Sequence, residues 1–176
     1  DYYCWGEVNT RSEYTWISYY GSGTSLPKYN NSELWGVVDN KSELELGDDI
    51  ANVRWGGVWR MPSRCEIEEL IVGCTWTWTT QNGVKGYKVS GKKAGFTENS
   101  IFLPAAGMHG ESGLDSVGVY SFYWSNTLWK SLPLISYGLA INTTDVFSSM
   151  ALRCYGYPVR GVCRSSGWEG ITSLDL

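Results

Sequence analysis

A strict alternation of threonine and tryptophan over residues 75–79 constrains the fold more than any other feature of the sequence. Successive side chains of a β-strand point to opposite faces, so this period of two predicts a half-buried strand with Trp76 and Trp78 on one face. The Asn-Gly pair at 82–83 is a favoured tight hairpin turn, and residues 84–89 are expected to form the return strand. The sequence therefore predicts an antiparallel hairpin.

The residues before this hairpin predict the one clear helix of the chain, over 63–72. Ser63 and Glu66 have the spacing of a capping box, and Gly73 is placed to end the helix. Apolar side chains recur at helical spacing, at Ile67, Leu70, Ile71 and Cys74. A brief helix is also expected near 48–53, with Asp48 as its N-cap.

The rest of the chain predicts short strands between long irregular loops. Residues 1–36 are rich in Tyr, Trp, Gly and Ser and predict loop-heavy structure with short strands. Further strands are predicted at 101–105, 119–125, 134–141 and 157–163. Helices early and antiparallel strands later indicate an α+β fold, and the absence of any linker-like stretch predicts a single domain over 1–176.

Composition narrows the classes of partner. Aromatic residues make up 15% of the chain, enough to supply both a core and a binding face. The net charge is −4 and the basic residues are scattered, so we expect no nucleic-acid partner. No apolar run approaches the ~20 residues of a membrane span, so we expect no membrane insertion by this chain. Because the sequence opens at Asp1 within what reads as folded sequence, we expect a mature or trimmed chain, with any leader or lipid anchor on a segment outside this sequence.

The cysteine and histidine content argues against a catalytic or metal centre. Five cysteines are an odd number, so at least one is unpaired within the chain; buried free thiols or one disulfide both fit. No CxxC spacing occurs, and His109 is the sole histidine, which leaves zinc sites and catalytic triads without partners. We therefore expect no metal, no cofactor and no enzymatic activity.

A series of short strings follows a fixed order along the chain. They are Asp48-Asp49-Ile50-Ala51, Trp55-Gly56-Gly57, Trp59-Arg60-Met61-Pro62-Ser63, Glu69-Leu70, Cys74-Thr75-Trp76-Thr77-Trp78, Asn99-Ser100-Ile101-Phe102-Leu103-Pro104-Ala105-Ala106-Gly107, Tyr123-Trp124-Ser125 and Pro158-Val159-Arg160. This ordered set resembles the Fibrobacter succinogenes major paralogous domain family of Bacteroidetes-type surface and secreted proteins. The resemblance runs from Trp5 to about Cys163 and leaves the tail 164–176 outside it.

The resemblance implies a C-type-lectin-like fold and a location outside the bacterial cell or on its surface. The fold is shared with the variable proteins of diversity-generating retroelements and with formylglycine-generating enzymes. The proline-containing loops that hold calcium in C-type lectins are missing from this sequence, which disfavours calcium-dependent glycan capture. Copper-binding cysteines like those of the formylglycine-generating enzymes have Cys154 and Cys163 as their nearest candidates.

The chain departs from the family in its C-terminal third, where apolar residues replace small polar ones. The matching segment of the retroelement-diversified relatives is the exposed binding face, so exposed apolar side chains there predict an interaction site. The predicted site residues are Leu128, Trp129, Lys130, Leu132, Leu134, Ser136, Ser148, Met150, Leu152 and Tyr155. The alternative is that this stretch forms core strands, for which the spacing of Leu134, Leu139 and Ile141 is suited.

Three functional hypotheses follow. The first is a monomeric ligand-binding module, displayed on the surface or secreted, that binds protein or glycan and is hypervariable through retroelement diversification. The second is a structural or assembly component of the bacterial cell surface. The third is an enzyme of the formylglycine-generating kind.

Overall fold

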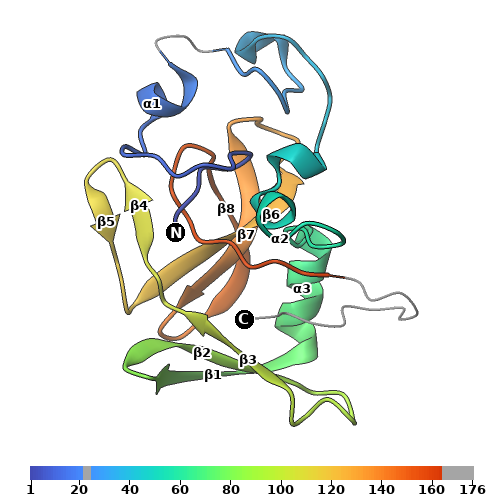
Figure 1. The fold of residues 1–176 in the computed structure, drawn as a ribbon, viewed down its shortest axis with the longest axis vertical. Coiled ribbons are helices and arrows are strands. Elements are labelled where there is room, and N and C mark those ends of the chain that lie inside the picture. Colours follow the sequence, from blue (N-terminus) through green and yellow to red (C-terminus); the bar gives the residue numbers. More distant parts are fainter. Residues whose placement is uncertain (22–24, 164–176) are drawn as a thin grey trace.

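Three antiparallel sheets and a few short helices make up the described part of the computed structural model, which comprises residues 1–21 and 25–163 (Figure 1). This mixed arrangement is compatible with the predicted α+β class, and the predicted tail 164–176 lies outside the described residues. The elements in chain order are α1 (Trp16–Tyr20), η1 (Glu33–Trp35), η2 (Leu46–Asp48), α2 (Ile50–Trp55), α3 (Arg64–Gly73), β1 (Cys74–Gln81), β2 (Val84–Gly91), β3 (Ser100–Pro104), β4 (Met108–Gly110), β5 (Gly113–Asp115), β6 (Tyr120–Leu128), β7 (Ile135–Asn142) and β8 (Val146–Leu152).

The predicted hairpin is present as β1 and β2. Asn82 and Gly83 both have positive φ, at 50° and 82°, as a tight turn that matches the twist of its strands requires. Trp76 and Trp78 share one face, and both indoles contact Tyr87 edge-on with ring centroids 5.8 and 5.0 Å away. β3 pairs with β2 to complete the sheet.

The predicted capping box opens α3. The Ser63 hydroxyl accepts from the Glu66 amide at 3.3 Å, and the Ser63 amide donates to the Glu66 carboxylate at 2.8 Å. The N-cap of the short helix α2 was predicted one residue too early: it is Asp49, whose buried carboxylate accepts from the amides of Ala51 and Met61. Asp48 is turned outward, where it forms an ion pair with Lys28.

The sheet of β6, β7 and β8 forms the middle layer of the molecule, between the N-terminal loops on one side and α3 with the β1–β3 sheet on the other (Figure 1). Phe122, Trp124 and Leu128 pack on the first side, whereas Tyr123 and Leu139 pack on the second. Because both of its faces are covered, β6 is buried along most of its length. The predicted strands at 119–125 and 134–141 correspond to β6 and β7.

Other strand predictions differ from the structure. Residues 157–163 form no strand; Tyr157 and Val162 make isolated bridges to Tyr3 and Arg60 instead. β4, β5 and β8 were not predicted, and β8 gave no signal because its apolar residues do not alternate cleanly with its polar ones. No helix among residues 1–21 and 25–163 has the length and apolar character needed to cross a membrane.

Two buried tryptophans attach the N-terminal segment to β6. The indole of Trp5 donates to the Ser125 carbonyl at 2.7 Å, and the indole of Trp124 donates to the Tyr3 carbonyl at 2.8 Å. Both indoles are 0% exposed, so water cannot replace either bond. An irregular segment is thereby held against the middle sheet at two points.

We expect Trp5→Phe to lower the free energy of unfolding by roughly 2–3 kcal/mol, because it leaves the buried Ser125 carbonyl without its donor and also creates a small cavity. Denaturant unfolding of the intact chain measures this change. Trp55→Phe is the matched control, since Trp55 is 54% exposed and the change there is expected to stay within about 0.5 kcal/mol. Equal losses in the two variants would contradict the role given to Trp5.

Candidate functional site

Three of the predicted site residues are buried. Leu128, Leu134 and Ser136 are 1%, 8% and 0% exposed. Leu128 pairs with Ser136 across β6 and β7, and Leu128 belongs to the core on the side of the N-terminal loops. The expectation that these three side chains face a ligand is therefore wrong, and for Leu134 the alternative of a core position holds.

The predicted site residues on β8, Ser148, Met150 and Leu152, lie beside Ile135 and Tyr137 of β7, two residues that were not among the predicted site residues. Register pairs Tyr137 with Met150 and Ile135 with Leu152, and these four side chains lie on one face of the sheet. Ser148 occupies the next position on the same face, opposite Leu139. Ile135 and Tyr137 continue the alternation of Leu139 and Ile141 along β7, which is the signal that would have found them.

The loop between β6 and β7 extends this face. The Trp129 amide donates to the Ile135 carbonyl at 3.0 Å, which places Trp129 beside the sheet residues. Lys130 is exposed, Leu132 is partly exposed, and Tyr155 is partly buried against the core. We call the partly exposed set the β8 surface; it comprises Trp129, Ile135, Tyr137, Ser148, Met150 and Leu152.

The first turn of α3 fixes the centre of the β8 surface. The Arg64 guanidinium lies 4.3 Å from the ring centroid of Tyr137 and donates to its hydroxyl at 2.9 Å. Glu68 holds the same guanidinium from the next turn of the helix, with 2.7 Å between Nε and Oε1. A cation above an aromatic ring that is also hydrogen-bonded gives Tyr137 a defined orientation beside the half-exposed Met150.

A second group of exposed apolar side chains lies in the N-terminal segment, which sequence reasoning did not consider as a site. Ile17, Leu34 and Val37 are 71%, 85% and 80% exposed. This segment borders the β6–β7 loop, because the Asn31 side-chain amide donates to the Lys130 carbonyl. Exposed apolar side chains therefore also occur outside the C-terminal third in which a site was predicted.

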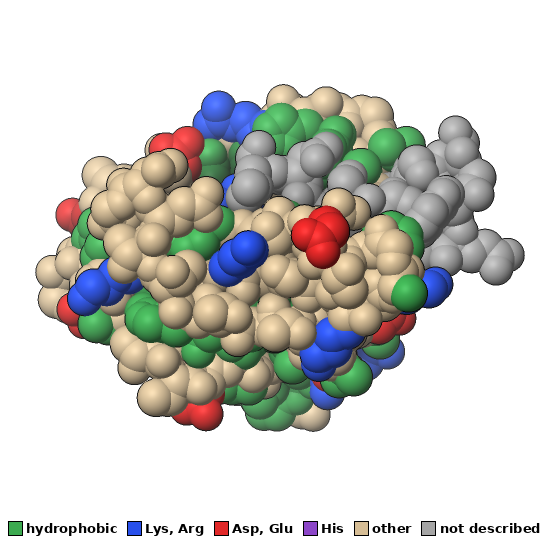
Figure 2. Space-filling view, turned by 90° about the horizontal axis from the view of Figure 1, so that it is seen from below, with side chains coloured by type: hydrophobic (Ala, Val, Ile, Leu, Met, Phe, Trp, Pro, Cys, Tyr) green, Lys and Arg blue, Asp and Glu red, His purple; other side chains and the backbone are tan. Residues whose placement is uncertain are grey.

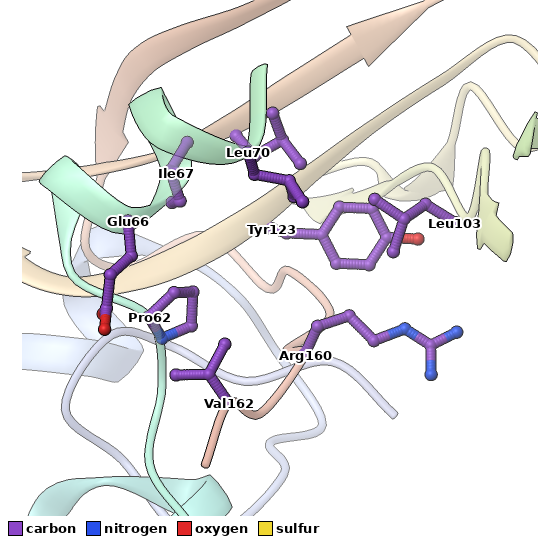
Figure 3. Close-up of a pocket in the computed structure, with 9 residues that line it drawn as sticks. Pro62, Glu66, Ile67, Leu70, Leu103, Tyr123, Arg160 and Val162 are labelled. Carbon is purple, nitrogen blue, oxygen red and sulfur yellow. The ribbon is translucent and has the colours of Figure 1, made fainter. Parts of the chain in front are cut away.

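A small pocket, partly open to solvent, lies between α3 and the two larger sheets (Figure 3). Glu66 stands at one end and Arg160 at the other (Figure 3). The Glu66 carboxylate is turned to Arg60, with Nη2–Oε1 and Nη1–Oε2 distances of 2.5 and 2.7 Å. The other lining residues are Pro62, Ile67, Leu70, Leu103, Tyr123, Leu139 and Val162. Because the Glu66 carboxylate binds Arg60, the pocket resembles a gap in core packing more than a catalytic cleft.

Neither the pKa values nor the charges of the described residues indicate a further catalytic or metal-binding site. Burial raises the pKa of the Cys154 thiol to about 11, so it is protonated near neutral pH and is a poor ligand for a soft metal. Within residues 1–21 and 25–163 no three His, Cys, Asp or Glu side chains gather as a metal site. On the face drawn in Figure 2, Lys and Arg side chains are dispersed among polar and apolar surface.

Comparison with known proteins gives no relative: no protein-family model, no curated protein and no solved structure matches the chain.

The Arg60–Glu66 pair predicts a loss of stability in acid. Burial acts to raise the pKa of Glu66, but hydrogen bonds from Arg60 and Ser63 outweigh it and lower that pKa from 4.5 to about 2. A lowered pKa stabilises the fold above pH 4.5, and this contribution is lost as the pH falls toward 2. It amounts to about 3 kcal/mol.

We expect Glu66→Gln to lose most of that stability near neutral pH and to flatten the dependence of unfolding free energy on pH between 4.5 and 2. Urea unfolding at a series of pH values measures both effects. Glu69→Gln, at an exposed position of the same helix, is the control and is expected to keep the acid-dependent slope. A Glu66→Gln variant with an unchanged slope would show that another carboxylate is responsible.

Proposed function

We propose that the chain is a ligand-binding module that uses the β8 surface to hold a protein or glycan. The observation that carries the proposal is the grouping of Tyr137, Met150 and Leu152 on one face of an antiparallel sheet, with Trp129 at its end. Partly exposed aromatic and apolar side chains on a rigid scaffold supply contact area at a low cost in side-chain entropy. Arg64 adds a fixed polar group at the centre of the same surface.

The proposal includes the C-type-lectin-like fold, a location outside the bacterial cell or on its surface, and diversification by a retroelement. Its support is the ordered series of sequence strings, together with short antiparallel sheets and few helices, an α+β arrangement compatible with such a fold. We propose further that the module acts as a monomer and performs no catalysis.

Binding to arrayed glycans and to displayed fragments of extracellular proteins tests this function. Met150→Glu places a charge at the centre of the β8 surface and is expected to weaken capture by about tenfold or more, the equivalent of ~1.4 kcal/mol. Its melting temperature is expected to stay within about 2 °C of the unmodified chain, because Met150 is already 44% exposed. The control is Val84→Glu, at a position 47% exposed beside the β1–β2 turn, which is expected to bind normally. Absence of binding in both arrays, or equal loss in the two variants, would refute the proposal.

A structural or assembly role is the second candidate, favoured by the strong exposure of Leu34 and Val37. Apolar side chains this exposed are suited to a fixed protein contact or to self-association. Light scattering over a range of concentrations separates the two roles. A constant monomer mass supports the binding module, and a mass that rises with concentration and falls in Leu34→Asp supports assembly.

A further inference from the structure

The middle sheet has two edges, and loops cover one of them. Along β6, the Trp124 amide donates to the Pro158 carbonyl at 3.3 Å and the Asn126 amide donates to the Pro62 carbonyl at 2.8 Å. The Gly107 amide also donates to the Tyr120 carbonyl, and the Leu128 amide donates to the Ser42 carbonyl, so loops are bonded to both ends of the strand as well. Loops of the same chain thus bond to β6 along most of its outer edge.

The other edge is β8, and hydrogen bonds at its two ends show which of its groups point outward. The Asn142 amide donates to the Asp145 carbonyl at 2.9 Å, and the Arg153 amide donates to the Leu134 carbonyl at 3.0 Å. Bonded and non-bonded pairs alternate along an antiparallel ladder, so every second residue of β8 between these two pairs turns its N–H and C=O away from β7. They are Leu152, whose carbonyl accepts from the Tyr155 amide at 3.1 Å, and the three residues Val146, Ser148 and Met150.

The outward backbone groups of these three residues make no hydrogen bond within the described part of the chain. Natural sheets normally protect an open edge with lysine, proline, a bulge or a covering loop. β8 has neither lysine nor proline, pairs with β7 without a register shift, and carries Phe147 and Met150 at 43% and 44% exposure. An unprotected seven-residue edge with apolar side chains is a template for another strand.

We propose that β8 binds an extended polypeptide segment as an additional antiparallel strand; this rests on the proposed function and names the ligand class for the same surface. An extended chain supplies the alternating donors and acceptors that Val146, Ser148 and Met150 require. A second folded copy fits less well: one strand edge offers on the order of 200–300 Å², against the roughly 800 Å² that each partner of a stable dimer buries.

The side chains beside β8 specify a pattern for this segment. In an antiparallel pairing, an apolar residue opposite Met150 is followed three positions later by an apolar residue opposite Phe147. Two positions further on, the segment reaches Asp145, an exposed carboxylate immediately before β8 that has no cationic partner among the described residues. The segment therefore carries Lys or Arg there, toward its C-terminal end.

The probe is a phage-displayed library of random peptides of about twelve residues, selected on the full chain. Enriched peptides are expected to share two apolar residues three positions apart and a basic residue two positions after the second. Ser148→Pro removes one outward N–H while leaving the β7 ladder intact, and is expected to weaken the best peptide by about tenfold or more. Ser148→Thr, which keeps the N–H, is expected to bind within about twofold of the unmodified chain.

Thr80→Pro is the control on the other open edge. Lys85 uses its carbonyl to bond Ala105, so Lys85 faces β3 and its partner Thr80 turns its own N–H outward from β1. Thr80→Pro thus makes the same change at a different edge and is expected to leave peptide binding unaltered. Equal losses in Thr80→Pro and Ser148→Pro would overturn the assignment to β8.

Modified peptides test the same geometry without altering the protein. N-methylation of the peptide residue opposite Ser148 is expected to abolish binding, whereas N-methylation of either neighbour is expected to be tolerated, because the N–H groups of the neighbours point away from β8. Saturation with peptide is expected to slow amide hydrogen exchange at Val146, Ser148 and Met150 by about tenfold or more.

Failure of this inference is distinguishable from failure of the proposed function. If glycans or folded fragments bind through Met150 while no peptide is enriched, or while Ser148→Pro binds normally, the β8 surface is a binding site and strand addition is wrong. If the free chain dimerises and Ser148→Pro abolishes the dimer, the occupant is a second copy, which also overturns the proposal.

Discussion

The paired hydrogen bonds of Trp5 and Trp124 are the constraint on which the rest of the structure depends. The Trp5 indole donates to a carbonyl of β6, the strand of Trp124, and the Trp124 indole donates to a carbonyl of the N-terminal segment, which carries Trp5. Both indoles are buried away from water. They fix the N-terminal segment over one face of the middle sheet, while α3 and the β1–β3 sheet take the opposite face. With both faces of β6 covered, the partly exposed side chains of this sheet lie mainly on β8 and the adjoining part of β7, which is where we propose that a partner binds.

A buried cation supports the end of that surface. Arg153 is 3% exposed and forms no ion pair with a described residue; its guanidinium donates instead to the Pro133 carbonyl at 2.9 Å and lies 4.7 Å from the Trp5 ring centroid. Carbonyl dipoles and ring faces take the place of a carboxylate in stabilising its charge. Because Pro133 belongs to the β6–β7 loop, the same side chain that packs on the N-terminal segment also positions the loop that carries Trp129.

The sequence predicted the helices and strands that are determined by residues close together in the chain. A capping box and an Asn-Gly turn act over four residues or fewer, and α3 and the β1–β2 hairpin form where those signals stand. The location of site residues depended on pairing between distant segments, which no local pattern contains. Leu128 and Ser136 face inward because the N-terminal segment lies over that face of β6 and β7, and β8 was missed because an edge strand need not alternate.

The contacts between the two ends of the described chain also set an order of events. Tyr3 exchanges backbone bonds with Tyr157, and the Trp5 amide donates to the Arg153 carbonyl. A chain emerging from a ribosome would carry Tyr3 without its backbone partner until Tyr157 had been made, and the Trp5 indole without its acceptor until Ser125 had been made. Completion of the core is thus a late, long-range step, and an aromatic-rich nascent segment of this kind would need protection from aggregation until the last strands were made.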